Sequence, residues 1–316
     1  MIEQHLDIPT ADGAMNTFVV HPEEGGPFPV VLLYMDAPGK REELHDMARR
    51  LATVGYYVVL PNLYYRNSRD YWLKERTEAG MAEMFSLMAT LNGRTTEVDT
   101  AALLAFADAQ PQANASRIGA VGYCMSGPFV MWAAAQFPGR FSSIASIHGA
   151  NMATDQPDSP HLMAPRILCE SYFACAEIDK WAPPADIQKL ESALKAAGTP
   201  HRIEWYPGVE HGFVFPLRAG IYDMKNATRH LMSSNAPAEV KSRKYVLGLG
   251  AMAVDKLNRR CNIDGFYDPS GHDLGALGLG DLERTNRLRS ELSQAGVSSL
   301  LHAVSFLVTV FGDKDK

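Results

Sequence analysis

The sequence predicts an α/β protein in which a mostly parallel sheet has helices on both faces. Three observations lead to this prediction. Short runs of branched apolar residues recur along the chain, helical patterns separate them, and this alternation continues to about residue 230. Strands that alternate with helices over such a length are typical of a parallel sheet, because each helix carries the chain back to the start of the next strand.

The first third of the chain contributes two strands and three helices to this prediction. Residues 29–35, PVVLLYM, form a continuous apolar run behind a proline, which is typical of a fully buried strand. Residues 41–55 have apolar side chains at positions i, i+3, i+4 and i+7, so they share one helical face, and a glycine ends the helix. Residues 56–61, YYVVLP, repeat the strand pattern, and residues 81–88 and 96–109 carry helical patterns.

The next part of the chain supplies the remaining strands. Residues 117–124, RIGAVGYC, form an apolar run that leads directly into a helix of small residues at 126–136. Three further strands follow, with one more helix between the last two. The strands are predicted at residues 141–149, 166–173 and 201–207, and the helix at residues 184–197.

The character of the sequence changes after this alternation, and we predict a domain boundary there. Residues 1–231 form the α/β domain, and residues 232–316 form a C-terminal extension of unknown role. The segment SSNAPAE at 233–239 has the small and turn-forming residues of a linker. The last predicted helix, SSLLHAVSFLVTVF, is apolar along one side, so we expect it to pack on the domain or to join subunits in a homo-oligomer.

The composition argues against several classes of protein. The chain has 316 residues, 30 Lys and Arg against 36 Asp and Glu, and a net charge of −6, which does not suit a nucleic-acid surface. No segment approaches the roughly 20 apolar residues of a membrane span, and MIEQHLDIP lacks the pattern of a secretory signal, so we expect a cytoplasmic protein. The four cysteines lack the paired spacing of a zinc site. We expect no metal, no cofactor and a small-molecule substrate.

Two weaker motifs do not change this expectation. Gly248-x-Gly250-x-x-Ala253 is a degenerate dinucleotide fingerprint, but it lacks the surrounding strand–helix–strand unit and the acidic residue that binds ribose. His272 and Asp273 are too isolated to indicate a metal site.

The segment GYCMSG at residues 122–127 is the most informative one for chemistry. A buried strand runs into a short turn between small residues and then into a helix, which is the form of a nucleophile elbow with Cys124 at its tip. The residues two before and two after the nucleophile crowd each other, so Gly122 and Ser126 have to be small. Ser126 is a poorer nucleophile candidate, because Cys124 and Pro128 would then occupy the crowded positions. Free N–H groups at the helix start favour the thiolate form of cysteine.

A cysteine nucleophile needs a base, and the base needs a carboxylate to orient it. In this arrangement the acid and the histidine follow the nucleophile along the chain, each in a loop after a later strand. Asp179 is the favoured acid because it lies between the end of a strand and the prolines that open the next helix, with Glu177 and Asp186 as rivals. His211 is the candidate base, in a glycine-containing loop after the strand at 201–207.

These segments together resemble the dienelactone hydrolase family of α/β-hydrolases. The resemblance is carried by GYCMSG, AEIDKWAP, PGVEHGF and LATVGYYVVLPNLYYR, and it extends from about residue 30 to about residue 230. It implies an α/β-hydrolase fold and a hydrolase of small esters or lactones, with Cys124 as nucleophile, Asp179 as orienting acid and His211 as base. It also implies that the backbone N–H groups of Met125 and Ala37 form the oxyanion hole.

The chain departs from the family pattern at two places. Asp36 stands where family members carry a glutamate that assists the cysteine, so Asp36 is expected either to exchange a proton with Cys124 or to order the following turn. The residues directly after His211 are uncharged, where the family has an arginine for a substrate carboxylate, and Arg218 or Arg94 are the candidate substitutes. A less polar ester, a lactone or a thioester therefore fits equally well.

Two alternatives to a small-ester hydrolase stay open at this point. A thioesterase or an acyltransferase would use the same three residues. A non-catalytic binding protein on the same fold would keep the residues without the reaction.

Overall fold

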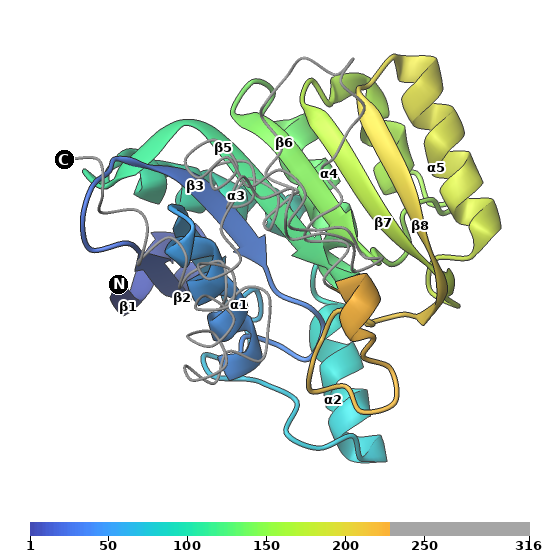
Figure 1. The fold of residues 1–316 in the computed structure, drawn as a ribbon, viewed down its shortest axis with the longest axis horizontal. Helices are drawn as coiled ribbons and strands as arrows, with labels where there is room; N and C mark the ends of the chain where they lie inside the picture. Colours follow the sequence, from blue (N-terminus) through green and yellow to red (C-terminus); the bar gives the residue numbers. More distant parts are fainter. Residues whose placement is uncertain (228–316) are drawn as a thin grey trace, which may run out of the picture. The chain divides into compact units, whose positions relative to one another are not determined.

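The computed structural model describes residues 1–227, which contain one eight-stranded sheet (Figure 1). The strands are β1 (Ile2–Thr10), β2 (Gly13–His21), β3 (Phe28–Tyr34), β4 (Tyr57–Pro61), β5 (Ala113–Tyr123), β6 (Phe141–Ile147), β7 (Glu170–Ile178) and β8 (His201–Glu210). Their order across the sheet is β1-β2-β4-β3-β5-β6-β7-β8. Pairing is parallel from β4 through β8, and only β1 and β2 introduce antiparallel pairs.

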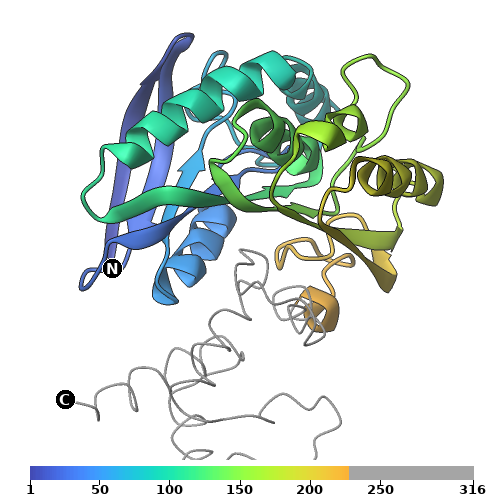
Figure 2. The ribbon, with the colours of Figure 1, turned by 90° about the horizontal axis from the view of Figure 1, so that it is seen from above.

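Helices cover both faces of this sheet. They are α1 (Glu42–Thr53), α2 (Glu78–Met88), α3 (Gly93–Asp108), α4 (Gly127–Gln136) and α5 (Pro184–Ala197). Figure 2 shows α1 on one face and α3, α4 and α5 on the other. The apolar face predicted for α1 is buried, with Leu44, Ala48 and Leu51 almost completely covered. The predicted fold class is therefore confirmed.

The parallel strands bring the predicted site residues to one edge of the sheet. Tyr34 of β3 pairs with Gly122 of β5, and Gly122 pairs with Ser146 of β6. The carboxyl ends of these strands are therefore level with one another. Segments that follow these ends meet in space although they are far apart in sequence, and ligand sites of open α/β sheets form at this edge.

An antiparallel hairpin at the N-terminus is a difference from the sequence analysis, which assigned no strands before residue 29. β1 pairs with β2 over its whole length, and the two-residue turn Ala11-Asp12 joins them. Gly13, the first residue of β2, has φ +137°, and an Asp-Gly dipeptide is a common signal of a hairpin. β1 is largely exposed and polar because it is the edge strand, so it lacks the continuous apolar run that identified the central strands.

The position of β7 is a second difference. The sequence predicted a strand at 166–173, whereas β7 spans Glu170–Ile178. The chain before it forms a 3-10 helix at Pro160–Arg166 that contains Pro165, and Leu168 lies 69% exposed in the connection. Since the strand ends five residues later than predicted, Asp179 follows its last residue directly.

The predicted boundary at residue 231 and the C-terminal extension, residues 232–316, lie outside the described residues, as do the final apolar helix and the Gly248–Ala253 turn. Within residues 1–227, no helix is both long enough and apolar enough to cross a bilayer.

Candidate active site

Cys124 occupies a strained turn between β5 and α4. Its φ is +55°, a left-handed conformation that is uncommon for a residue with a side chain and that marks many functional turns. Cys124 is the first residue of a one-turn 3-10 helix, Cys124–Ser126, and α4 begins at Gly127. A Cβ atom on Gly122 would lie 2.1 Å from the carbonyl oxygen of Ser126, so the crowding expected from the elbow motif is present.

Ser126 fastens this turn to the neighbouring strand. Its Oγ accepts a hydrogen bond from the backbone N–H of Tyr123 at 3.1 Å and lies 2.8 Å from the carbonyl oxygen of Met35, to which it donates. Met35 directly follows β3, so the Ser126 hydroxyl connects the elbow to the segment that leads into Ala37. The sequence indicates a small residue and a poorer nucleophile candidate at Ser126, but not this hydrogen-bonding role.

His211 and Asp179 form a hydrogen-bonded pair at the same edge of the sheet. The Nδ1 atom of His211 lies 2.7 Å from Oδ2 of Asp179, and both side chains are largely buried. The other oxygen of Asp179 accepts a hydrogen bond from the backbone N–H of Trp181 at 2.8 Å, which fixes the carboxylate. Because Nδ1 is engaged by Asp179, Nε2 is the ring nitrogen left for the interaction with Cys124.

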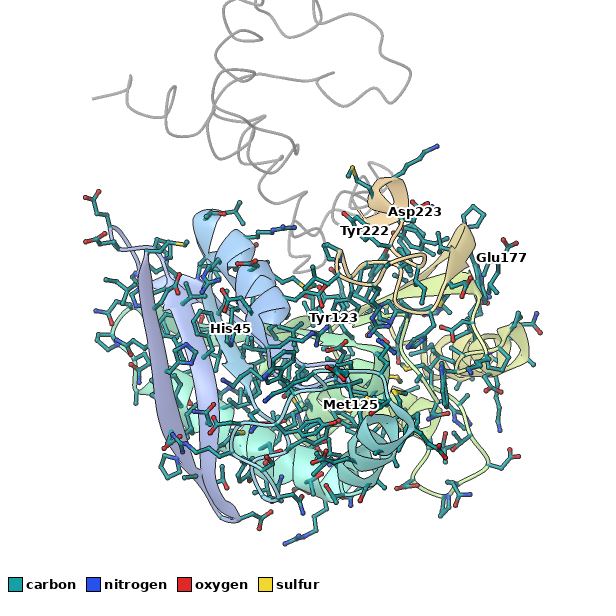
Figure 3. The ribbon with its side chains drawn as sticks, turned by 90° about the horizontal axis from the view of Figure 1, so that it is seen from below. His45, Tyr123, Met125, Glu177, Tyr222 and Asp223 are labelled. Atoms are coloured by element: carbon teal, nitrogen blue, oxygen red, sulfur yellow. The ribbon has the colours of Figure 1, made fainter. Side chains whose placement is uncertain are left out.

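The two rival acids lie elsewhere. Glu177 accepts a hydrogen bond from the backbone N–H of Gly208 at 2.7 Å, and Figure 3 shows it at the outer side of the sheet, away from Tyr123 and Met125. Asp186 lies in the first turn of α5, where an acidic residue complements the helix dipole. Of the three candidates, Asp179 is the one that the structure pairs with His211.

The ring of His211 is held in an environment that favours its charged form. Burial opposes the positive charge, but the Cys124 sulfur and the Asp179 carboxylate outweigh burial and raise the pKa of His211 to about 9. The His148 ring packs against it edge to face, with ring centroids 4.8 Å apart. His148 is itself buried among Tyr123, Phe213 and Phe215, so this packing restricts how the catalytic candidate can rotate.

We expect His211 to titrate near pH 9 in the wild-type protein, and at a lower pH in Cys124→Ser and in Asp179→Asn. The reason is that each substitution removes a group that stabilises the imidazolium. Nitrogen-detected NMR titration of the ring measures this directly. Since the pKa is raised above its unfolded value of about 6.5, the stability it contributes is complete below pH ~6.5 and is lost as the pH rises through ~9.

The outcome that contradicts this prediction is a wild-type midpoint at or below 6.5. A wild-type midpoint near 9 that neither substitution lowers would also contradict it, because the cause would then lie outside this group of residues.

Cys124 and His211 both line one pocket of about 330 Å³ above the carboxyl ends of β3 and β5. This volume is at the small end of the range typical of small-molecule sites, ~300–1,000 Å³. Ala37, which comes after β3, and Met125, which directly follows Cys124, line the pocket too. Figure 3 places Met125 near the middle of the described residues. Cys124, His211 and the two residues implied for the oxyanion hole thus share one cavity, whereas Asp179 does not line it.

Tyr64 contacts both of the residues implied for the oxyanion hole. Its hydroxyl donates to the carbonyl oxygen of Ala37 at 2.8 Å and lies 3.3 Å from the sulfur of Met125. Tyr64 is fully buried, and burial raises its pKa, so the hydroxyl keeps its proton. No motif around Tyr64 indicates this role, because Tyr64 follows a different strand, β4.

Asp36 lies in an ion-pair network rather than alone beside the thiol. One carboxylate oxygen accepts a hydrogen bond from Arg41, and the other lies 2.8 Å from a guanidinium nitrogen of Arg218. Asp36 is completely buried, and two arginines compensate its charge. Of the two roles expected from the sequence, this arrangement supports the ordering of the following loop.

The two arginines predicted to bind a substrate carboxylate differ in their position relative to the pocket. Arg218 lines the pocket, whereas Arg94 lies in the first turn of α3 and is not among the residues that line it. Arg76, directly before the N-cap of α2, is a further arginine at the pocket. Arg76 is not among the arginines predicted from the sequence, because it lies ahead of the predicted helix at residues 81–88 and of its N-cap, Thr77.

A strained cysteine between β5 and α4, with an acid after β7 and a histidine after β8, is the arrangement of an α/β-hydrolase. The model of the dienelactone hydrolase family matches residues 15–236. The chain therefore belongs to the dienelactone hydrolase family, and it is a hydrolase that acts on carboxylic ester or lactone bonds. The resemblance noted from the sequence motifs is confirmed.

Known relatives agree with this placement. A Methylorubrum extorquens protein, provisionally named a carboxymethylenebutenolidase, is 28% identical over 216 residues, which are 67% of this chain and 72% of the relative. The carboxymethylenebutenolidase of Pseudomonas putida is 22% identical over 70% of this chain and 89% of its own. A Klebsiella pneumoniae structure, provisionally named a dienelactone hydrolase, aligns with a TM-score of 0.63 at 23% identity and covers 72% of this chain and 93% of its own.

Proposed function

We propose that this protein hydrolyses a small ester or lactone through a covalent thioester on Cys124. The observation that carries the proposal is the His211–Asp179 pair, which leaves Nε2 of a charged imidazole in the same pocket as the cysteine. A nucleophile, a base and an orienting carboxylate in this relation form the recurring machinery of covalent acyl transfer.

In the first half-reaction the Cys124 thiolate attacks the carbonyl carbon and a C–S bond forms. The carbonyl oxygen takes the negative charge, and the N–H groups of Met125 and Ala37 donate hydrogen bonds to it. The carbon–oxygen bond to the alcohol then breaks, and His211 gives its Nε2 proton to the leaving oxygen. For a lactone, the alcohol stays attached to the acyl group because the ring has opened.

In the second half-reaction water cleaves the thioester. His211, now neutral, accepts a proton from the water, and the hydroxide attacks the thioester carbon. The C–S bond breaks, the sulfur leaves as the thiolate, and His211 keeps the proton that restores the starting pair. Asp179 holds the ring throughout, so that Nε2 faces the reacting atoms in both steps.

We also propose that the substrate carries an anionic group. Arg76 lines the pocket, and it forms no ion pair with another described residue. Desolvation by the surrounding protein, followed by the nearby charge of Arg218, lowers the pKa of Arg76, and the residue is exposed to solvent, so an anionic group can reach it. Arg218 contributes less, because its charge is already matched by Asp36.

The covalent step is tested by trapping the intermediate. The wild-type protein is mixed with a panel of lactones, aryl esters and thioesters, quenched in acid within milliseconds, and digested for mass spectrometry. We expect turnover of esters or lactones, and an acyl adduct on the peptide that contains Cys124. Burial raises the pKa of Cys169 and of Cys175 to about 12, so these two thiols serve as internal controls and stay unmodified.

Two results would overturn the proposal. One is turnover with the acyl group on a residue other than Cys124. The other is the absence of turnover across the whole panel. Turnover of thioesters alone would instead identify a thioesterase that uses the same three residues.

A further inference from the structure

Helix α2 presents an apolar face to the active-site pocket. Met81, Met84, Phe85 and Met88 lie at positions i, i+3, i+4 and i+7, so they share one side of the helix, and all four line the pocket. The remaining side of α2 is mostly exposed to solvent, and Met84 is its only fully buried residue. This apolar face therefore lines the pocket, and most of it is not buried in the hydrophobic core.

Helix α4 supplies the facing wall. Phe129 and Trp132 line the same pocket, and their rings are stacked with centroids 5.5 Å apart. Pro128, one residue earlier, also lines it. Because α4 begins three residues after Cys124, these aromatic side chains follow the proposed nucleophile closely along the chain.

Phe85 of α2 also lies beside Trp181, which belongs to the loop between β7 and α5 and lines the same pocket. Their ring centroids lie 6.2 Å apart, and each side chain is 38% exposed. Trp181 comes from the loop whose backbone holds Asp179, so the aromatic pair connects α2 to the catalytic loop. Two half-exposed aromatic side chains at the rim of a pocket are well placed to cover an apolar ligand.

The pocket lining includes residues along the whole of α2. Arg76 lies just before the helix and Met88 is its last residue, and both line the pocket. A helix of 11 residues is about 16 Å long. The lining therefore combines a cationic group ahead of α2 with methionine and phenylalanine side chains along the helix.

The apolar side chains of α2 and α4 that line the pocket are called the apolar trench below; they are Met81, Met84, Phe85, Met88, Phe129 and Trp132. We propose that this apolar trench is an acyl-binding subsite, which selects substrates with an unbranched apolar chain or an aryl group of similar length. The inference rests on the hydrolase function proposed above and names the class of its substrate. Methionine side chains are flexible and polarizable, so they adapt to chains of different length. Together with Arg76, the trench fits an amphipathic substrate, with the anionic group near the start of α2 and the apolar group along the helix.

A chain-length series tests the inference. The wild-type enzyme is assayed with p-nitrophenyl acetate, butyrate, hexanoate and octanoate. We expect kcat/KM to rise about threefold to fourfold per methylene, equivalent to ~0.8 kcal/mol, until the trench is filled. Binding of the free acids acetate to octanoate, measured by calorimetry, is expected to strengthen in parallel without any chemical step.

Two matched substitutions on α2 locate the subsite. Met88→Gln places a polar amide in the trench, and we expect it to reduce the ratio of octanoate to acetate turnover by about tenfold or more. Ser86→Gln places the same amide on the exposed side of the helix, and we expect this ratio to stay within about twofold of wild type.

The two proposals can fail separately. If esters are hydrolysed but neither kcat/KM nor acid binding depends on chain length, the acyl subsite is wrong and the hydrolase proposal stands. If no ester is hydrolysed, the binding series still decides: affinity that grows with chain length and falls in Met88→Gln supports the subsite. Affinity that is equal for all four acids overturns it.

Discussion

Cys124→Ala is expected to reduce the hydrolysis of esters by about 10³-fold or more, while the protein stays folded. The substitution removes the sulfur that forms the covalent bond, and the remaining groups can only bind substrate and polarise its carbonyl. Alanine keeps the Cβ atom of a partly exposed residue, so the packing of the elbow is little changed. The measurements are kcat/KM for p-nitrophenyl esters and the thermal unfolding temperature of the same samples.

Cys175→Ala is the matched control for this prediction. It removes the same atom from a cysteine buried in β7, where burial keeps the thiol protonated and unreactive. We expect this variant to retain activity, with a modest loss of stability from the small cavity. If Cys124→Ala kept more than about a tenth of wild-type kcat/KM, the nucleophile would have to be another residue.

Gly122→Ala is expected to cause a large loss of stability. The added Cβ atom would lie 2.1 Å from the Ser126 carbonyl oxygen and 2.7 Å from its carbonyl carbon. Both are backbone atoms of the elbow, so they cannot move without displacing Cys124 or the start of α4. Overpacking of this kind costs about 3 kcal/mol or more. Urea unfolding followed by circular dichroism measures the change.

Gly93→Ala provides the comparison, because Gly93 opens α3 and its Cβ atom would meet only Trp132, at 3.7 Å. Alanine favours a helix over glycine, so we expect Gly93→Ala to be neutral or to stabilise the protein by up to about 1 kcal/mol. Equal unfolding free energies for the two variants would show that the elbow tolerates a larger residue at position 122.

The candidate site could be read from sequence because its parts are local motifs placed by strand order. Cys124 was marked by the strand, small-residue turn and helix around it, and His211 by its place after the last strand. Asp179 was chosen over Glu177 from its place before the prolines of α5, although the strand ahead of it was placed too early. The fold class followed in the same way from the continuous apolar runs of the central strands.

Other features could not be read because they depend on contacts between distant segments. The starts of α2 and α3 were placed three residues late, since the caps Thr77 and Asn92 were not recognised. The hairpin of β1 and β2 was missed because an edge strand needs no apolar run. The partners that surround the site, Ser126, Tyr64, His148 and Arg76, come from four different segments, and no spacing along the chain connects them.

The distribution of the site over the sheet has a consequence for how activity is acquired. Ala37, Cys124, Asp179 and His211 follow four different strands, and the first and last are separated by most of the described chain. If these residues act together as proposed, the site is complete only when β8 has docked beside β7. We therefore expect hydrolysis to require completed folding, and to be lost in a partly folded state in which β8 is detached, even if the elbow itself is formed.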